Sequence, residues 1–590
     1  MAVNGDAATI TLGTYLFKRI RQLGVGTVLG VPGDFQLELL DYLYKVPNLR
    51  FVGNANELNA AYAADGYARV RGLPGVFVTT HGVGELSALN GVVGAKTEQV
   101  KVIHIVGQTP RFMQKNRLMI HHSLGFDPDH QIYNEMSRHA RLTQAELHLF
   151  ENDIPGAARE IDRVIRECMV RSGPVYIFIP LNMVHEELPA SLLDTPIDLS
   201  LPVDIKAQTA AVEAIKTALQ EAKKPAIFAD ALTHRHNAVP EARALAKRLQ
   251  IPAFAANMGK GILDESDDFW VGIYHGQVNW PGVTDALESS DLILVLGSLP
   301  CDTNTGGFQR KFGTDKTIEI NPNYVVVKGK QFPKTYIKPL LAELTKSLEG
   351  VEIAKVPIPQ LPQRKIPRDH EASHLTQTWI WKEIASTFRP GDVVLGETGT
   401  ASFGLVGERW PQDMTYIFQG YYGSIGYANP AALGADLALQ DIADETEAPR
   451  RRTYLVIGDG SLNLTINEIG TMCTYGAKPV IVVVNNAGYT IERVIHGARQ
   501  PYNDINPTAY DHLLPVFKHP DPENCFRRVV QKSEFAAAFD PSRIENNKHL
   551  QLIEVVLDKL DVPWQLLTHL KRRGEKQIKY MQEEGFKEQY

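Results

Sequence analysis

The chain has 590 residues, of which 44% are hydrophobic and 22% are charged. Domains usually contain about 100 to 200 residues, so we expect two to four domains, with three as the working number. The net charge of -7 comes without a long basic run, which argues against nucleic acid or an anionic membrane as a partner.

The first block runs from Thr11 to about Leu188 and alternates short apolar runs with longer amphipathic stretches. The runs GTVLGVPG, RFVGN, GVFVTTHG, VKVIHIVG and PVYIFIP have the length of strands, whereas ELNAAYAADGYARV has helical periodicity. This alternation is typical of βαβ units around a buried parallel sheet. The next segment, Pro189 to Lys206, is rich in Pro and Asp and is predicted to be a linker.

The rest of the chain repeats this organisation twice. PAIFAD, PAFAAN, DLILVLGS and KTIEIN are strand candidates in the second block, and a Pro-dense stretch, EIAKVPIPQLPQRKIPRDHE, then excludes a helix or a central strand. DVVLGETG, TYIFQG, RTYLVIGDG and PVIVVVNN are strand candidates in the third block. We therefore expect an α/β fold of three domains, each a mainly parallel sheet flanked by helices, at residues 1–188, 207–350 and 373–570.

Cysteines and apolar stretches bear on the compartment. The 4 cysteines include no C-x-x-C pair, so neither a disulfide scaffold nor a zinc site is expected. No secretory signal is evident at the N-terminus, and no apolar stretch approaches the about 18 residues of a membrane span. We expect a soluble, cytoplasmic protein.

The strongest local signal lies in TYLVIGDG and VIVVVNNAGYTIE, the ends of two successive predicted strands. Asp459 and Gly460 follow the first strand, and a helix is expected to start soon after Ser461, which would point N–H groups and a hydroxyl at a diphosphate. Asn486 and the carbonyl of Gly488 follow the second strand and, with Asp459, offer oxygen ligands that suit Mg²⁺. A lone GDG would be only a turn, but the pairing favours a cofactor site.

These paired motifs resemble the signature of thiamine-diphosphate enzymes. In GNANELNAAYAADGYARV, Glu57 follows a predicted strand and opens a helix, where that family places an acid against a ring nitrogen of the cofactor. Burial beside the ring would raise the pKa of this carboxyl and help it to pass on a proton. On its own, Glu57 would be interpreted as a first-turn residue that stabilises the helix dipole.

Three further features narrow the resemblance. VPGDFQLELLD carries Asp34, MIHHSLG carries His121 and His122, and NNAGYTIERVIHG carries Glu492. From TLGTYLFKRIRQLGV to about Leu552 the chain closely resembles fungal and bacterial pyruvate decarboxylases, with their indolepyruvate and phenylpyruvate relatives. Carboxylates and imidazoles suit the proton transfers that aldehyde release requires. An isolated HisHis pair would more often be an ordinary surface or capping feature. The companion motifs are what favour a role in proton transfer here.

The resemblance implies thiamine diphosphate and Mg²⁺ as cofactors, with a pyrimidine-binding first domain, a regulatory-type middle domain and a diphosphate- and metal-binding third domain. It also implies that Asp34 and the two histidines act with Glu492 of another subunit, so that the protein is at least a homodimer and is expected to be a homotetramer. The implied cofactor contacts are Thr398, Thr400, Gly423, Ile425, Gly460, Ser461, Tyr489 and Thr490. Ile425 matches the residue that bends the cofactor, although it could equally be a core residue.

The implied substrate pocket includes Thr303, Ser402, Ile491 and Ile495. Pyruvate-selective relatives have Phe or Tyr at the Thr303 position, so the smaller residue predicts room for branched or aromatic 2-oxo acids beside pyruvate. Such steric changes are worth about 1 to 3 kcal/mol, which gives a preference rather than a switch. Alternatively, Thr303 only caps a turn beside Asn304.

Two positions depart from the family pattern. Leu232 stands where the best-known fungal members have a cysteine linked to substrate activation, so activation through that thiol is in doubt. His81, in VTTHGVGELSA, stands where many relatives have an aromatic residue.

The predicted function is decarboxylation of a 2-oxo acid to an aldehyde and CO2. A carboligase similar to acetolactate synthase would share Glu57 and the paired motifs, but it should not protonate its intermediate quickly, so the HisHis pair and Glu492 argue against it. A regulatory homologue without turnover would be expected to lack one of the acids, and none is missing.

Overall fold

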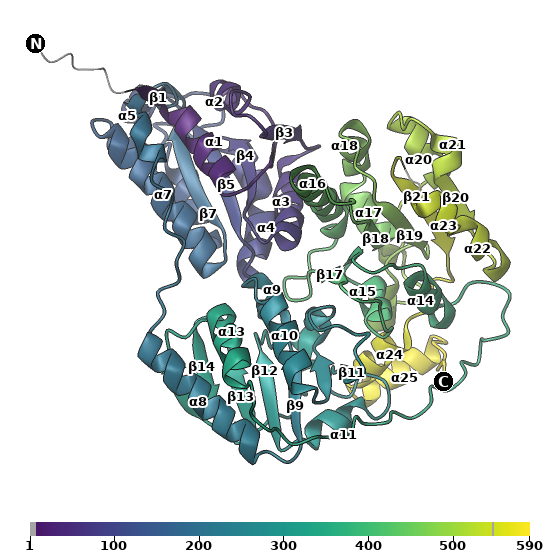
Figure 1. Cartoon of the computed structure of the whole chain (residues 1–590). Coiled ribbons are helices and arrows are strands. Elements are labelled where there is room, and N and C mark those ends of the chain that lie inside the picture. The colour runs from purple at the N-terminus through teal and green to yellow at the C-terminus, as the bar shows by residue number, and fades with distance from the viewer. Residues whose placement is uncertain (1–7, 546–547) are drawn as a thin grey trace, which may run out of the picture. The chain divides into compact units, whose positions relative to one another are not determined.

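The computed structural model describes residues 8–545 and 548–590, and these form three large sheets and one two-stranded sheet (Figure 1). The chain divides into two compact units. The first unit contains residues 1–200, 430–450 and 467–477, and the second contains residues 201–429, 451–466 and 478–590. Two segments of the third predicted block therefore belong to the first unit.

The sheet of the first unit is parallel throughout, with the order β3-β2-β4-β5-β7-β6. Five strands coincide with the predicted apolar runs. The sixth, β6, has the sequence TQAE, whose polar residues give no strand signal. The strands are β2 (Thr27–Gly30), β3 (Arg50–Gly53), β4 (Gly75–Thr80), β5 (Val102–Gln108), β6 (Thr143–Glu146) and β7 (Val175–Pro180).

Helix α3 (Glu57–Arg71) is buried along almost its whole length, which explains its many alanines. It packs against α4 (Val83–Thr97), against the sheet, and against the part of α16 (Ala428–Thr446) that belongs to this unit. A Cβ on Gly66 would lie only 2.1 Å from the carbonyl oxygen of Ala431, so this close approach needs glycine. Helices α1 (Leu12–Gln22) and α7 (Ile154–Arg171) also pack against each other in this unit.

The middle sheet has the order β11-β10-β9-β12-β13-β14-β15 and is parallel from β11 to β13, after which β14 and β15 run antiparallel. The four predicted strands are present, and three further strands complete the sheet. Helices α8 (Ile205–Glu221), α10 (Val239–Leu249) and α13 (Ile337–Ser347) bury its apolar side chains. The strands are β9 (Pro225–Ala229), β10 (Ala253–Ala255), β11 (Trp270–Ile273), β12 (Leu292–Leu296), β13 (Thr317–Ile320), β14 (Tyr324–Val327) and β15 (Lys330–Pro333).

The third sheet is parallel, with the order β17-β16-β18-β19-β21-β20. Four of its strands are those that the sequence predicts, and β20 and β21 extend the sheet on one side. The strands are β16 (Val393–Gly396), β17 (Thr415–Ile417), β18 (Thr453–Gly458), β19 (Val480–Asn485), β20 (Phe526–Val529) and β21 (Gln551–Val556).

The two predicted linkers differ in the structure. The Pro-dense stretch at 352–371 forms neither helix nor strand, as predicted. The segment from Pro189 to Lys206 is only partly a linker, because β8 (Glu187–Pro189) pairs with β1 (Thr9–Thr11), a short helical turn spans Ala190–Leu193, and α8 already begins at Ile205.

The first and third sheets have the same strand order when the strands of each sheet are numbered along the chain. In both, the second strand lies on one side of the first strand and the third strand lies on its other side, so the direction of the order reverses at the first strand. Ligands of parallel sheets bind beyond the carboxyl ends of the strands at such a reversal. The loops that follow β2 and β4, and those that follow β16 and β18, are therefore the places to look for a site.

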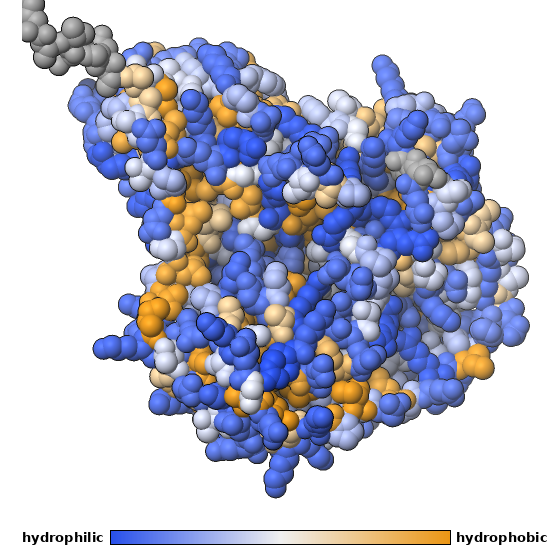
Figure 2. All heavy atoms as spheres, viewed as in Figure 1, coloured by the Kyte–Doolittle hydropathy of each residue, from blue (hydrophilic) through white to orange (hydrophobic). Residues whose placement is uncertain are grey.

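Hydrophilic residues cover most of the face seen in Figure 2, with hydrophobic residues scattered among them. Among the described residues, no helix combines the length and the apolar character needed to cross a membrane.

Candidate active site

The predicted proton-transfer residues of the first unit lie together at the reversal of its sheet. Asp34 lies in the turn after β2, and its Oδ2 is 2.5 Å from Nε2 of His121. The rings of His121 and His122 are 4.7 Å apart, and Phe35 stacks on His121 at 5.2 Å. Residues from two separate motifs are thus brought within hydrogen-bonding distance, although their catalytic roles stay a prediction.

Glu57 is the first residue of α3, which follows β3 as the sequence predicts. Asn56 caps the helix by accepting a hydrogen bond from the backbone of Asn59 at 2.8 Å, so the Glu57 carboxylate is not needed as the cap. That carboxylate lies against the first turn of α4, where a Cβ on Gly84 would be 3.2 Å from its Oε1. Glu57 is half-buried.

Glu468 is a site residue that the sequence does not reveal. It belongs to α18 (Glu468–Thr474), is fully buried, and accepts hydrogen bonds from the side-chain amides of Asn54 at 2.7 Å and Asn59 at 2.6 Å. Burial raises the pKa of its carboxyl, and the bonds from these amides oppose that rise. Glu468 therefore fixes the turn that leads into Glu57, and only the tertiary structure brings these distant residues together.

The predicted metal ligands lie at the ends of β18 and β19. Asp459 is 1% exposed, and its carboxylate accepts hydrogen bonds from the backbone N–H groups of Gly460 at 2.8 Å and Gly488 at 3.1 Å. Burial raises the pKa of Asp459 to about 6, while the surrounding N–H groups oppose that rise. Helix α17 (Asp459–Thr465) begins at Asp459, not after Ser461, because the backbone turns directly out of the strand, so the predicted helix start is wrong.

Asp459, Asn486 and the carbonyl of Gly488 converge at this point. The side-chain amide of Asn486 donates to Oδ1 of Asp459 at 3.2 Å and to the carbonyl oxygen of Gly488 at 2.8 Å, and its oxygen accepts from the Thr490 hydroxyl at 2.8 Å. The amide N–H lies between two oxygen atoms that could bind a cation, and rotation of the amide would offer the Asn486 oxygen as a third ligand. The residues present therefore fit Mg²⁺, which prefers oxygen ligands.

The predicted cofactor contacts Thr398 and Thr400 follow β16 in a loop with an open stretch of backbone. The Thr398 backbone donates to Oε1 of Glu397 at 2.9 Å, and its hydroxyl donates to the carbonyl of Gln419 at 3.2 Å. Gly399 has φ of +117° and precedes Thr400, the first residue of α15 (Thr400–Leu405), and a Cβ on Gly399 would meet nothing within 4 Å. This stretch of backbone is accessible to a ligand.

Glu397 is a second buried acid that the sequence does not reveal as a site residue. It is 1% exposed at the end of β16, and its other carboxylate oxygen accepts from the backbone of Ala428 at 3.0 Å. Burial raises its pKa to about 7, whereas its backbone hydrogen bonds lower it. Its bond to Thr398 positions a predicted cofactor contact.

The remaining cofactor contacts line the same end of this sheet. Gly423 has φ of +65° with space around it, and Ile425 is 40% exposed, so it is not the core residue that the alternative interpretation requires. Tyr489 packs so closely on Gly460 that a Cβ there would lie 2.5 Å from the Tyr489 ring. Ser461 and Thr490 are buried nearby in the first turns of α17 and α19 (Thr490–Ile495).

Arg493 holds the loop that carries the metal ligands. Its guanidinium is buried and donates to the carbonyls of Ala487 at 3.0 Å, Asn503 at 3.0 Å and Ala498 at 2.9 Å. Glu492, its neighbour on α19, is exposed. The same short helix therefore anchors the loop with one residue and presents a predicted proton-transfer group with the next.

The predicted substrate-pocket residues are all buried or half-buried. Ile491 and Ile495 are half-buried and pack in one cluster with Phe403. Ser402 is buried and donates to the carbonyl of Gly399 at 2.9 Å. Thr303 is half-buried in the first turn of α12 (Asp302–Thr305), and its role as a pocket wall stays a prediction.

The Thr303 hydroxyl donates to the carbonyl of Gly420, three residues before Gly423. It therefore joins the loop after β12 to a segment with predicted cofactor contacts, and the alternative in which it only caps its own turn is wrong. Leu232 is buried in α9 (Ala231–Arg235), and none of the four cysteines of the chain forms a disulfide.

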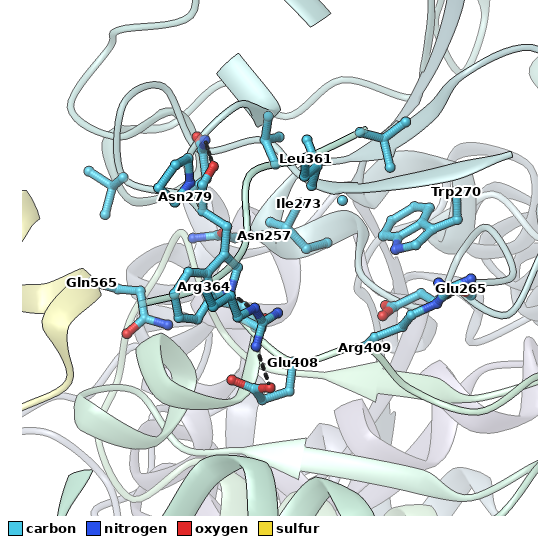
Figure 3. Close-up of a pocket in the computed structure, with 18 of the residues that line it drawn as sticks. Asn257, Glu265, Trp270, Ile273, Asn279, Leu361, Arg364, Glu408, Arg409 and Gln565 are labelled. Carbon is cyan, nitrogen blue, oxygen red and sulfur yellow. Dashed lines mark hydrogen bonds and ion pairs between the residues drawn. The ribbon is translucent and has the colours of Figure 1, made fainter. Parts of the chain in front are cut away.

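A separate cavity of about 160 Å³ lies in the second unit and is lined by none of the predicted site residues (Figure 3). Arg364, from the Pro-dense stretch, crosses its wall, stacking on Trp280 at 3.9 Å and pairing with Glu408 at 2.8 Å. The cavity lies where the middle domain, that stretch and the third sheet's helices meet. Its two arginines are already bonded, Arg364 to Glu408 and Arg409 to the carbonyls of Glu265 and Asp267.

Three family models match the chain in order. They describe the N-terminal thiamine pyrophosphate binding domain of thiamine pyrophosphate enzymes over residues 10–136, the central domain over residues 212–348, and the C-terminal thiamine pyrophosphate binding domain over residues 399–550. The fold and the ligand-binding loops thus define a thiamine pyrophosphate enzyme, and its cofactor is thiamine diphosphate.

Curated relatives narrow the class. The chain is 43% identical to a pyruvate decarboxylase of Kluyveromyces marxianus over 561 residues, which cover 95% of this chain and 97% of the relative. It is 42% identical to a pyruvate decarboxylase of Candida glabrata and 40% identical to pyruvate decarboxylase isozyme 1 of Saccharomyces cerevisiae, in each case over 95% of this chain and 98% of the relative. The chain belongs to the pyruvate decarboxylase family of thiamine pyrophosphate enzymes.

Proposed function

We propose that the protein catalyses the non-oxidative decarboxylation of pyruvate to acetaldehyde and CO2. The observation that carries this proposal is the cluster of Asp34, His121 and His122, whose ligand atoms all lie within 4.8 Å of one another. A carboxylate paired with an imidazole can both donate and accept a proton near neutral pH. Decarboxylation to an aldehyde requires one proton to be added at carbon and one to be removed from oxygen.

Bound thiamine diphosphate supplies the electron sink for loss of CO2. Asp459, Asn486 and the carbonyl of Gly488 would hold Mg²⁺, which would neutralise the diphosphate. Glu57 would donate a proton to the pyrimidine ring of the cofactor, and Ile425 would contact the cofactor. Support for these roles comes from the convergence of Asp459, Asn486 and Gly488 and from the half-exposed position of Ile425.

We further propose that the pocket accepts branched or aromatic 2-oxo acids beside pyruvate. Thr303 presents a small side chain whose hydroxyl is occupied by the Gly420 carbonyl, so its methyl group is what remains to face a substrate. Ser402 is likewise small and has its hydroxyl bonded within its own helix. Ile491 and Ile495 supply an aliphatic wall.

The experiment is a panel of 2-oxo acids with purified protein, thiamine diphosphate and Mg²⁺, with aldehyde detected through a coupled dehydrogenase. Pyruvate should give acetaldehyde, and phenylpyruvate or branched substrates should give measurable rates. The same incubation with pyruvate alone tests the second candidate, a carboligase, which would form acetolactate. Acetolactate as the main product would overturn the proposal.

The organisation of the protein is part of the proposal. Active sites combine Asp34 and the histidines of one subunit with Glu492 and the metal ligands of another, which requires a homodimer, and two dimers form a tetramer of dihedral symmetry. The three domains span residues 1–188, 207–350 and 373–570, which the three family models support. Four cysteines without a disulfide support a reducing, cytoplasmic location.

A further inference from the structure

The cavity beside Arg364 in the second unit is lined by buried amide side chains that lack hydrogen-bond partners (Figure 3). Gln565, the second residue of α24 (Trp564–Lys571), is 6% exposed, and its Oε1 is unpaired within the described part of the chain. Asn257 is 4% exposed, and its Oδ1 is likewise unpaired. Two buried acceptors therefore border a space of about 160 Å³.

An occupant of the cavity would satisfy these unpaired oxygens. A buried acceptor without a partner loses the hydrogen bonds that water gives it in the unfolded chain, which destabilises the folded state. The Nδ2 group of Asn257 faces Nδ1 of His275 at 2.9 Å, so rotation of this amide would exchange the unpaired group and not remove it. The cavity therefore suits a molecule that brings a hydrogen-bonding group of its own.

Much of the cavity wall is aromatic and apolar. The indole rings of Trp270, Trp280 and Trp564 line it, with aliphatic residues such as Ile273. The ring of Trp280 lies 4.7 Å from that of Trp564, and its N–H donates to the Gly407 carbonyl at 2.7 Å. A cavity of about 150 Å³ with apolar walls can bind benzene. The space here therefore fits one six-membered ring with a small substituent.

The charged residues around the cavity already have partners. Arg364 pairs with Glu408 at 2.8 Å, and the carboxylate of Glu265 accepts hydrogen bonds from Nζ of Lys260 at 2.8 and 2.9 Å. Arg409 is exposed to solvent and donates to the carbonyl of Glu265. An ionised ligand would give up its hydration without gaining a free opposite charge, so the cavity favours a neutral ligand.

We propose that this cavity is a binding site for a neutral aromatic molecule with one hydroxyl group, either a phenol or a small aromatic alcohol. The ring lies against the indoles, and the hydroxyl forms a hydrogen bond with the amide of Gln565. A hydroxyl both donates and accepts, so it suits an amide in either orientation. The site is separate from the predicted active site, and the proposal does not depend on the proposed function.

The cavity is accessible and borders two helices of the second unit. Pro362 and Arg364, from the Pro-dense stretch, line it and are exposed to solvent. The lining segment 406–409 directly follows α15, and α24 packs against both α15 and α19. A ligand can therefore enter from solvent. It would contact α24 and the segment after α15, the helix that begins with the predicted cofactor contact Thr400.

The test compares three probes on the full-length protein with thiamine diphosphate and Mg²⁺. Phenol carries the hydroxyl, toluene has a methyl group of similar size in its place, and benzoate adds a charge. Saturation-transfer NMR over a range of probe concentrations gives each Kd. For the wild type we expect a Kd of about 1 mM or below for phenol and binding of benzoate at least about tenfold weaker. Benzoate that binds this cavity as tightly as phenol would overturn the choice of a neutral ligand.

Gln565→Met removes the amide and keeps the length of the side chain. It should lower the ratio of the toluene Kd to the phenol Kd about tenfold, because phenol loses a hydrogen bond that toluene does not make. The matched control is Gln377→Met, because Gln377 is buried in the same unit with both amide groups unpaired and does not line the cavity. The control should keep the wild-type ratio, and an unchanged ratio in Gln565→Met would overturn the proposal.

Leu361→Trp fills the cavity from the Pro-dense stretch, where it disturbs neither helix nor strand. It should weaken binding of phenol and toluene alike by about tenfold or more, and it decides the question if Gln565→Met fails to fold. Phenol that binds Leu361→Trp and the wild type equally well would occupy another site, such as the predicted substrate pocket, and would refute the proposal. No phenol binding by the wild type would leave water as the occupant and would refute it as well.

Discussion

The side-chain amide of Asn486 donates to Oδ1 of Asp459 at 3.2 Å, at the ends of two neighbouring strands of one sheet. The two side chains are thus close enough to bind one cation when the amide turns its oxygen toward Asp459. Asp459→Ala should therefore weaken binding of thiamine diphosphate in the presence of Mg²⁺ at least tenfold, which is about 1.4 kcal/mol, because the metal joins the diphosphate to the protein.

Calorimetric titration with thiamine diphosphate, with and without Mg²⁺, measures this effect. The matched control is Asp392→Asn, because Asp392 is also buried in the second unit but pairs with Arg452 and precedes β16. The control should bind cofactor as the wild type does. Unchanged affinity in Asp459→Ala would count against the metal site.

Glu57→Gln should keep the fold and lower kcat by about 100-fold or more, since an amide cannot donate the proton that a carboxylic acid donates. The helix itself should persist, because Asn56 caps it. Glu38→Gln, in the first turn of α2 (Leu37–Leu43), is the control for loss of a first-turn carboxylate and should leave kcat unchanged. Circular dichroism reports the fold, and near-normal turnover by Glu57→Gln would contradict the assignment of Glu57 as the proton donor.

Two inactive variants should restore activity when they are combined. Asp34→Ala and Glu492→Ala would each be inactive alone, but a mixed dimer contains one site with both substitutions and one site with neither. Random assortment makes half of the dimers mixed, so co-expression should recover about a quarter of wild-type activity. Two copies of Asp34→Ala with different tags provide the control. No recovery above that control would contradict the shared site.

Substrate preference should follow the size of residue 303. Thr303→Phe should shift the ratio of phenylpyruvate to pyruvate efficiency toward pyruvate by about 10- to 100-fold, which corresponds to 1 to 3 kcal/mol. Thr303→Val separates size from hydrogen bonding, because it keeps the volume and removes the hydroxyl that binds the Gly420 carbonyl. It should keep the wild-type ratio. Equal ratios in wild type and Thr303→Phe would show that this residue does not set the pocket.

Stability should fall on acidification because of His275. This residue is 1% exposed, stacks on His569 at 5.9 Å, and has its pKa lowered to about 3 by burial, with the neighbouring His569 adding to the effect. The folded state excludes a proton that the unfolded chain binds below about pH 6.5. Its contribution to stability is therefore present above that pH and is lost as the pH falls from 6.5 toward 3.

At pH 5 this loss should be on the order of 2 kcal/mol. Scanning calorimetry at pH 7.5, 6 and 5 measures it, and His275→Gln should flatten the dependence, because the glutamine does not titrate. The same slope in the variant and the wild type would assign the acid sensitivity to other groups, of which buried His104 is the first to examine.

Much of the fold follows from sequence because buried parallel strands are continuous apolar runs. GVFVTTHG and PVIVVVNN predict β4 and β19, and Pro-dense 352–371 predicts a stretch without helix or strand. Strands such as β6, with the sequence TQAE, are not predicted because a short edge strand need not be apolar. Helix α17 begins at Asp459 and not after Ser461, since hydrogen bonds across the turn, not composition, decide where a helix starts.

The residue types of the site can likewise be predicted from local motifs, because carboxylates at strand ends and adjacent histidines are recognisable residue by residue. The distances between these residues cannot be predicted in this way. Only tertiary structure brings Asp34 to His121, places Glu468 beneath the turn before Glu57, and buries His81 beside Glu85. Such contacts join residues that are distant in sequence or differ in burial. A pKa depends on those surroundings, and the residue type alone does not contain them.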